Sequence, residues 1–475
     1  MKRLLFSFII LFFVQAIYAH PWKPSHYVIV DTDGGIDDIR AITLLLASPD
    51  VRVLAITVSP GVLDAENAYR KVKSLLNTYH HEGIPVGINR SSDLISSGYP
   101  VALGVFWGNE ENLHPSEAPS DYEVINYALS NEKTPVSFIC LGGLNTAYNG
   151  LRNIPEFSRQ VREILWSADG AHDTKGFNYN IDTQAAKKIL KEFTHVKIIM
   201  GAGEKPFYDD QLLKSISEVN TRYASEISET FKSEIIKSHP YSFMATDEMV
   251  PLYLQFPGIF VADSAGRVAE FRPAVETVLK DKMIVMLSGE TVAANQVIKN
   301  LPTDPSFYFD DIKPSVKEII DKYGMDEWSS GVQANELHRH LGVFAIIGVK
   351  MGIRAREYFD TGVDEFSVTS FAGSEPPLSC MNDGLQVSTG ATPGHGLLTV
   401  RTDTILSASA EFTYLGRKIR LSLKPAIAAS VSDELKQINF VYGLDSNIYW
   451  ELVRKNTIKY WKDLDRHEIF DIEVL

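Results

Sequence analysis

The segment Tyr27–Arg40, with the sequence YVIVDTDGGIDDIR, constrains the fold of this chain more than any other segment. A short apolar run ends near two glycines, and the run AITLLLA follows, which together predict a buried strand, a tight turn and a helix. Four aspartates, Asp31, Asp33, Asp37 and Asp38, lie at this strand-to-helix junction. In open α/β sheets such a junction borders the usual ligand crevice.

These four carboxylates fall within eight residues, so they repel one another unless a cation compensates them. A hard cation with oxygen ligands, such as Ca²⁺ or Mg²⁺, would supply that compensation. One aspartate at such a junction is explained by helix capping or turn formation. Four of them after a buried strand favour a metal site.

Other apolar runs, each followed by a helical stretch, predict the rest of a sheet. The expected strands are Val51–Val58, the short run IPVGI, Val136–Leu141, the run EILWSADG and the run VKIIMGAG. Strands that alternate with helices indicate a mostly parallel, doubly wound α/β sheet. We expect this domain to occupy residues 20–290.

Composition and the N-terminus bear on partners and location. The net charge of −14 argues against binding to nucleic acid, because no basic face is left to neutralise phosphates. Residues 1–19 carry Lys2 and Arg3, then an apolar run, then the small residue Ala19, a pattern typical of a secretory signal peptide. We therefore expect a secreted or periplasmic protein without a membrane anchor after cleavage.

Four motifs carry a resemblance to a known family. Besides DTDGGIDD they are LGGLNTA at Leu141–Ala147, GFNYNIDTQAA at Gly176–Ala186 and TDEMV within Ala245–Phe260. In order and spacing the chain resembles the inosine-uridine-preferring nucleoside hydrolases. That resemblance implies hydrolysis of the N-glycosidic bond of a ribonucleoside or related ribosyl compound.

The resemblance also implies a Ca²⁺ site and a ribose site. The calcium ligands would be Asp33, Asp38, Asp247 and the main-chain carbonyl of Asn145. Asp33 would also take the proton from the attacking water. Asp37 and Asn178 would hold ribose hydroxyls, and Asp31 would support the metal cluster from behind.

Two positions depart from the family pattern on the side of the leaving group. Gly176 stands where the family has a glutamate, and Thr246 where it has a histidine associated with protonation of the leaving group. His172, in a nearby loop, is a candidate substitute acid. Two alternatives therefore stay open: a hydrolase, or a protein that captures a ribosyl ligand without hydrolysing it.

The last third of the chain forms a second predicted domain, residues 313–475, after a linker at 291–312. Its motifs NELHRHLG and SCMNDGLQVSTG resemble those of the FmdE family, which is associated with formylmethanofuran dehydrogenase. The resemblance indicates a smaller α+β domain.

Within this second domain, His338, His340 and Cys380 are candidate ligands of a second metal such as Zn²⁺, with Asp383 in support. A helix start at Cys380 would favour a thiolate. A third functional alternative places the catalytic chemistry in this second domain. For the oligomeric state, we keep a homo-oligomer open as an alternative.

Overall fold

The computed structural model describes residues 24–90, 99–168, 176–203, 205–289 and 301–475. The signal-peptide prediction, His172 and part of the expected linker lie outside these residues. The chain divides into two compact units, with the division between Val292 and Ala293. The N-terminal unit comprises residues 24–292 together with Glu357–Thr361, and the C-terminal unit comprises the rest from residue 293 onward.

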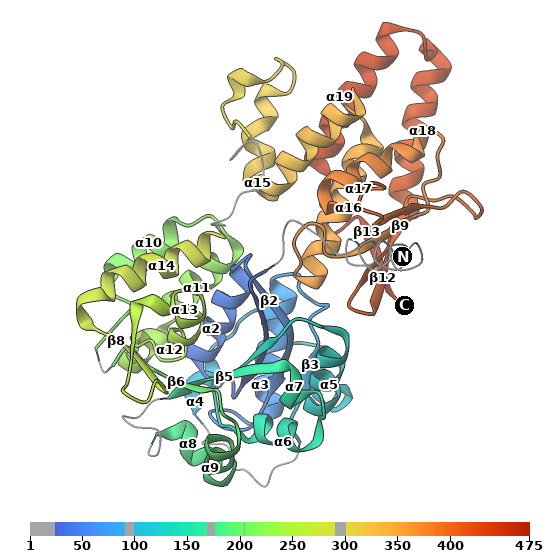
Figure 1. Ribbon diagram of the computed structural model, residues 1–475. Helices are drawn as coiled ribbons and strands as arrows, with labels where there is room; N and C mark the ends of the chain where they lie inside the picture. Colours follow the sequence, from blue (N-terminus) through green and yellow to red (C-terminus); the bar gives the residue numbers. More distant parts are fainter. Residues whose placement is uncertain (1–23, 91–98, 169–175, 204, 290–300) are drawn as a thin grey trace, which may run out of the picture. The chain divides into compact units, whose positions relative to one another are not determined.

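An eight-stranded sheet forms the centre of the N-terminal unit (Figure 1). Its spatial order is β3-β2-β1-β4-β5-β6-β8-β7, and only β7 runs antiparallel to its neighbour. The strands are β1 (His26–Thr32), β2 (Val51–Val58), β3 (Val86–Ile88), β4 (Val136–Cys140), β5 (Val161–Ala168), β6 (Val196–Met200), β7 (Phe260–Ala262) and β8 (Val268–Phe271). The predicted parallel, doubly wound sheet is confirmed, and the hairpin β7–β8 is an addition that the apolar runs did not indicate.

Helices cover both faces of this sheet. One layer contains α2 (Ile36–Ala47), α3 (Ala65–Thr78), α11 (Arg222–Lys232), α13 (Met249–Gln255) and α14 (Glu276–Ser288), and the other contains α5 (Asp121–Asn131), α6 (Asn145–Asn153) and α9 (Thr183–Glu192). Strand β1 lies between β2 and β4, so the chain order reverses on its two sides. Such a reversal opens a crevice at the carboxyl ends of the strands.

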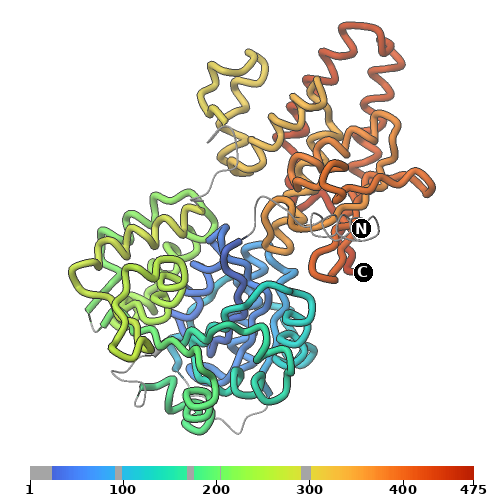
Figure 2. The backbone as a smooth tube through the Cα atoms, in the orientation of Figure 1, coloured from blue at the N-terminus to red at the C-terminus, as the bar shows by residue number. Residues whose placement is uncertain are grey.

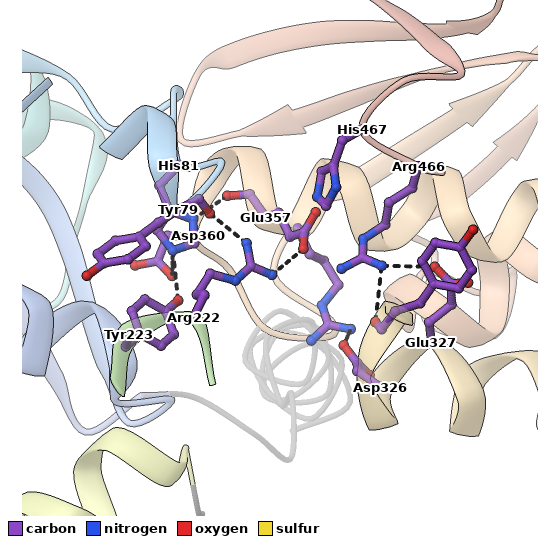
Figure 3. A network of polar contacts seen from close by, with 12 residues as sticks. Tyr79, His81, Arg222, Tyr223, Asp326, Glu327, Glu357, Asp360, Arg466 and His467 are labelled. Carbon is purple, nitrogen blue, oxygen red and sulfur yellow. Dashed lines mark hydrogen bonds and ion pairs between the residues drawn. The ribbon is translucent and has the colours of Figure 1, made fainter. Parts of the chain in front are cut away.

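The segment Glu357–Thr361 belongs to the N-terminal unit, where polar contacts hold it (Figure 3). The His81 Nδ1 atom lies 2.6 Å from the Glu357 carbonyl oxygen, and its Nε2 atom lies 2.8 Å from the Tyr223 hydroxyl. The Arg222 guanidinium forms an ion pair with the Glu357 carboxylate.

The C-terminal unit combines helices with a five-stranded, mostly antiparallel sheet. Figure 2 traces the backbone of this unit in yellow to red. The sheet order is β10 (Leu398–Val400), β9 (Ser367–Ser370), β11 (Ser409–Tyr414), β12 (Arg417–Leu423) and β13 (Phe470–Val474). The helices are α15 (Lys313–His338), α16 (Val343–Phe359), α17 (Met381–Thr389), α18 (Pro425–Tyr442) and α19 (Asn447–Asp463). The expected smaller α+β domain is confirmed. No helix in the described ranges is long and apolar enough to cross a membrane.

Candidate active site

The junction between β1 and α2 places the aspartate motif in the middle of the sheet. Strand β1 ends at Thr32, and α2 begins at Ile36. Between them Gly34 has a φ of +83°, and a Cβ atom there would lie 2.9 Å from the Ala68 Cβ. Both the left-handed backbone and the close approach of α3 therefore require glycine. This tight turn directs Asp37 and Asp38 into the first turn of α2.

Three carboxylates from two separate segments converge at this junction. Oxygen atoms of Asp37, Asp38 and Asp247 all lie within 4.8 Å of one another. Asp247 precedes α13, more than 200 residues along the chain. The Asp38 Oδ1 atom accepts hydrogen bonds from the Thr32 hydroxyl at 2.6 Å and from the Asp33 N–H at 3.2 Å. These bonds orient the Asp38 carboxylate.

Asp33 lies beside this cluster, and its buried carboxylate has few polar neighbours among the described residues. Both of its carboxylate oxygens are buried and form no hydrogen bond of normal geometry with the described residues. The carboxylate packs against glycines: a Cβ atom on Gly61 would lie 2.1 Å from the Asp33 Oδ2 atom, and one on Gly142 3.1 Å from it. Asn145 begins α6, and its buried side-chain oxygen also lacks a partner among the described residues. Buried oxygens without partners are costly unless a cation or a ligand engages them.

The pKa shifts of the clustered aspartates also favour a bound cation. Burial raises the pKa of Asp37 to about 7, and the neighbouring Asp38 carboxylate adds to that shift. Burial, followed by the charge of adjacent aspartates, raises the pKa of Asp33 and of Asp247 well above the ordinary value. These carboxylates therefore lack enough positive charge around them. All-oxygen donors with excess negative charge fit a hard divalent cation such as Ca²⁺.

Asp31 has a different environment behind the cluster. Its carboxylate accepts hydrogen bonds from the Thr57 hydroxyl at 2.6 Å and the Ser59 hydroxyl at 2.9 Å. Burial still raises the pKa of Asp31 to about 7. Asp31 therefore fixes the ends of β1 and β2 relative to each other and does not open into the pocket.

A cavity of about 360 Å³ lies over the carboxylates. The polar part of its lining contains the four acids Asp33, Asp37, Asp38 and Asp247 together with Asn178. The Asn178 amide nitrogen donates to the Leu141 and Ser167 carbonyl oxygens at 2.7 and 3.2 Å, so the backbone ends of β4 and β5 orient this side chain. The lining also contains the aromatic and apolar side chains of Tyr99, Val101, Phe177, Tyr241 and Met244, together with the imidazole of His239.

Sequence reasoning missed a buried polar group beneath this pocket. The Arg40 Nε atom lies 2.6 Å from Glu248, and the guanidinium donates to the carbonyl oxygens of Ser242 and Met244 at 2.7 and 3.1 Å. Glu248 also accepts a hydrogen bond from the Tyr208 hydroxyl at 2.9 Å. Arg40 therefore ties the pocket wall at residues 242–244 to the helix that carries Asp37 and Asp38. The available signal was an arginine inside an otherwise apolar helical run.

The two positions that depart from the family pattern lie in the lining of the cavity or next to it in the sequence. Gly176 is the N-cap of α8 (Phe177–Ile181) and offers no side chain. Thr246 lines the cavity and has no group that ionises near neutral pH.

The candidate ligands of the C-terminal unit are only partly brought together. The His338 Nδ1 atom lies 2.7 Å from the Asp383 carboxylate, its Nε2 atom is buried without a partner among the described residues, and its ring centroid lies 4.2 Å from that of His340. In the described part of the chain, the Cys380 sulfur and the ring nitrogens of His338 and His340 do not form a set of ligand atoms that all lie within 4.8 Å of one another. Burial and the Asp383 charge raise the pKa of the Cys380 thiol to about 11. This direction is opposite to the thiolate that a helix start would favour.

Together, a doubly wound parallel sheet and a carboxylate-lined pocket at its chain reversal define an α/β protein with a candidate metal-binding active site. The family model for inosine-uridine preferring nucleoside hydrolase matches residues 28–307, more than half of the chain. The chain belongs to this family and is a hydrolase that acts on N-glycosyl bonds. A second family model, described as FmdE, molybdenum formylmethanofuran dehydrogenase operon, matches residues 337–442, so the predicted fusion is confirmed.

Individual relatives agree with this assignment at low identity. The inosine-uridine preferring nucleoside hydrolase of Crithidia fasciculata is 22% identical over 258 residues, which cover 50% of this chain and 81% of that protein. The enzyme of the same name from Leishmania major is 22% identical over 270 residues, covering 53% and 85%. Among solved structures, the purine-preferring ribonucleoside hydrolase from Gardnerella vaginalis is similar with a TM-score of 0.42 and 15% identity, covering 55% of this chain and 98% of that one.

Proposed function

We propose that this protein is a secreted, Ca²⁺-dependent hydrolase that cleaves the N-glycosyl bond of a ribonucleoside or a related ribosyl compound. The observation that carries the proposal is the convergence of Asp37, Asp38 and Asp247 beside the buried carboxylate of Asp33, which accepts no hydrogen bond of normal geometry from the described residues. A family fold alone does not require these four side chains to share a pocket.

The side chains of the pocket divide into two roles. Asp33, Asp38 and Asp247 would hold the ion together with the Asn145 carbonyl. Calcium bound there would lower the pKa of a coordinated water. Asp33 would accept the proton of the attacking water, because its oxygens have no other partner of normal geometry among the described residues.

Asp37 and Asn178 would bind the ribose hydroxyls. N-glycosyl cleavage passes through an oxocarbenium-like state, and the surrounding carboxylates stabilise its positive charge. The aromatic part of the lining, with Tyr99 and Tyr241, suits a planar base.

Metal analysis of three variants tests the site. Asp38→Asn and Asp247→Asn remove one proposed ligand charge each while keeping the side-chain shape. We expect both to lose bound calcium, measured by elemental analysis of protein prepared without chelators, and to lose hydrolysis by at least about 100-fold. Asp64→Asn is the matched control, since Asp64 caps α3 and asparagine caps equally well. Calcium retained at full occupancy in both site variants would refute the assignment.

Two further parts of the proposal concern the ends of the chain. Export with removal of residues 1–19 predicts a mature protein that begins near His20, which N-terminal sequencing of secreted material checks. In the C-terminal unit, Asp383 orients His338, and the His338 Nε2 atom has no hydrogen-bond partner in the described part of the chain, an arrangement common among metal-binding histidines. We infer that His338, with His340 or Cys380, is the Zn²⁺ candidate in this unit. Loss of copurified zinc from His338→Ala would support it.

A further inference from the structure

Cleavage of an N-glycosyl bond leaves an electron pair on a nitrogen of the departing base, and that nitrogen requires a proton. The carboxylates of the pocket gather on the side of the proposed ion, and Thr246 does not ionise. Among the described residues that line the pocket, the only imidazole is that of His239. An imidazolium is a stronger acid than the phenols of Tyr99 and Tyr241, which also line the pocket.

We propose that His239 is the general acid that protonates the leaving base. This inference rests on the proposed hydrolase function. The Nδ1 atom of His239 lies 2.8 Å from the Ile235 carbonyl oxygen, which can only accept a hydrogen bond, so Nδ1 carries a proton. The second ring nitrogen, Nε2, is therefore the one that can give up a proton to a ligand.

The backbone around His239 is held in place relative to the acidic cluster. The Ser242 N–H donates to the His239 carbonyl oxygen at 2.9 Å, and this bond closes the first turn of the short 3-10 helix Pro240–Phe243. Arg40 then fixes the carbonyl oxygens of Ser242 and Met244. Arg40 lies one turn after Asp37 on α2, so one helix positions both Asp37 and the segment 242–244 that follows His239.

The proton balance of the step is complete. The C1′–N bond breaks and its electron pair moves to the base nitrogen, which takes the proton from His239 Nε2. Water adds to C1′ and gives a proton to the Asp33 carboxylate. The products are free ribose and the neutral base, and the next proton exchange with solvent resets both side chains.

Leaving-group dependence tests this role. We expect His239→Gln to lower kcat/KM for inosine by about 100-fold or more, the usual contribution of general acid catalysis. The same variant should change the rate on p-nitrophenyl riboside by less than about threefold, because the nitrophenolate departs without a proton. His195→Gln, an exposed histidine outside the pocket, is the matched control and should change neither rate.

Two additional measurements separate a chemical role from a structural one. Calcium affinity by calorimetry should be unchanged in His239→Gln, and added imidazole should restore inosine hydrolysis by His239→Ala. An equal loss on both substrates, or no loss on inosine, would overturn the assignment of His239. A wild-type chain that hydrolyses neither riboside would overturn the proposed function and this inference with it.

Discussion

Buried charge is handled in opposite ways in the two units of this protein. In the N-terminal unit, burial and neighbouring carboxylates raise the pKa values of Asp33, Asp37 and Asp247, in agreement with the proposed calcium site. In the C-terminal unit, the fully buried Lys350 and Glu327 pair at 2.5 Å. Arg466 donates to the same carboxylate at 3.0 Å (Figure 3). The Glu327 carboxylate is thus neutralised by side chains of the protein.

The buried Lys350 predicts a pH dependence of stability. Burial lowers the pKa of Lys350 from 10.5 to about 8. Between pH 8 and 10.5 the unfolded chain therefore binds more protons at this lysine than the folded chain, so its contribution to stability increases as the pH rises across this window.

Chemical unfolding of the wild type and of Lys350→Met at several pH values checks this sign. From pH 8 to 10.5, the free energy of unfolding of the wild type should increase relative to that of Lys350→Met by on the order of 3 kcal/mol. In Lys350→Met, Arg466 still pairs with Glu327, so the variant keeps that carboxylate compensated. A difference that stays flat or falls with pH would show that Lys350 is not desolvated in this way.

At the scale of elements, the site depends on how closely loops approach β1. The carboxyl end of β1 is packed by the loop after β2, in which Gly61 faces Asp33. Because an added Cβ atom on Gly61 would fall 2.1 Å from the Asp33 Oδ2 atom, any side chain there must displace the carboxylate or the loop.

Gly61→Ala should therefore impair the site without removing any functional group. We expect calcium affinity to fall by at least about tenfold, measured by calorimetry, because Asp33 is displaced. Gly258→Ala is the control, since no atom lies within 4 Å of a Cβ placed there. Unchanged affinity in Gly61→Ala would place Asp33 outside the calcium site.

The elements that the sequence predicted well are those with a one-dimensional signal. Buried parallel strands such as β1 and β2 are continuous apolar runs, and an aspartate motif directly after one marks the crevice. The antiparallel sheet of the C-terminal unit was not predicted, because its strands alternate buried and exposed residues over short lengths, as β12 does. The Arg40–Glu248 pair joins positions 208 residues apart and leaves no local pattern. The convergence of Asp247 was anticipated only through family resemblance.

At the scale of the whole molecule, the chain consists of two compact units with separate cores. Tryptophans Trp328 and Trp461 stack at 5.1 Å inside the C-terminal core, and the proposed calcium site lies entirely within the N-terminal unit. A ligand stabilises only the unit that binds it.

Calorimetric unfolding of the full chain should therefore show two transitions, of which calcium raises only one. At a calcium concentration about 100 times Kd, the gain should be roughly 2.7 kcal/mol for the N-terminal unit. The variant Asp247→Asn should abolish the shift while keeping both transitions. Equal shifts of both transitions in the wild type would contradict a site confined to one unit.

We propose above that this chain hydrolyses N-glycosyl bonds with calcium held by Asp33, Asp38 and Asp247. The most direct test of this proposal is the initial rate of free ribose release from inosine, uridine and p-nitrophenyl riboside by the purified full chain. Rates are compared with added calcium, after removal of calcium by a chelator, and for Asp247→Asn. We expect release from inosine or uridine with calcium, a loss of at least about 100-fold on chelation that calcium reverses, and no rescue of Asp247→Asn. Ribose release that is unaffected by both the chelator and the substitution would contradict the proposal.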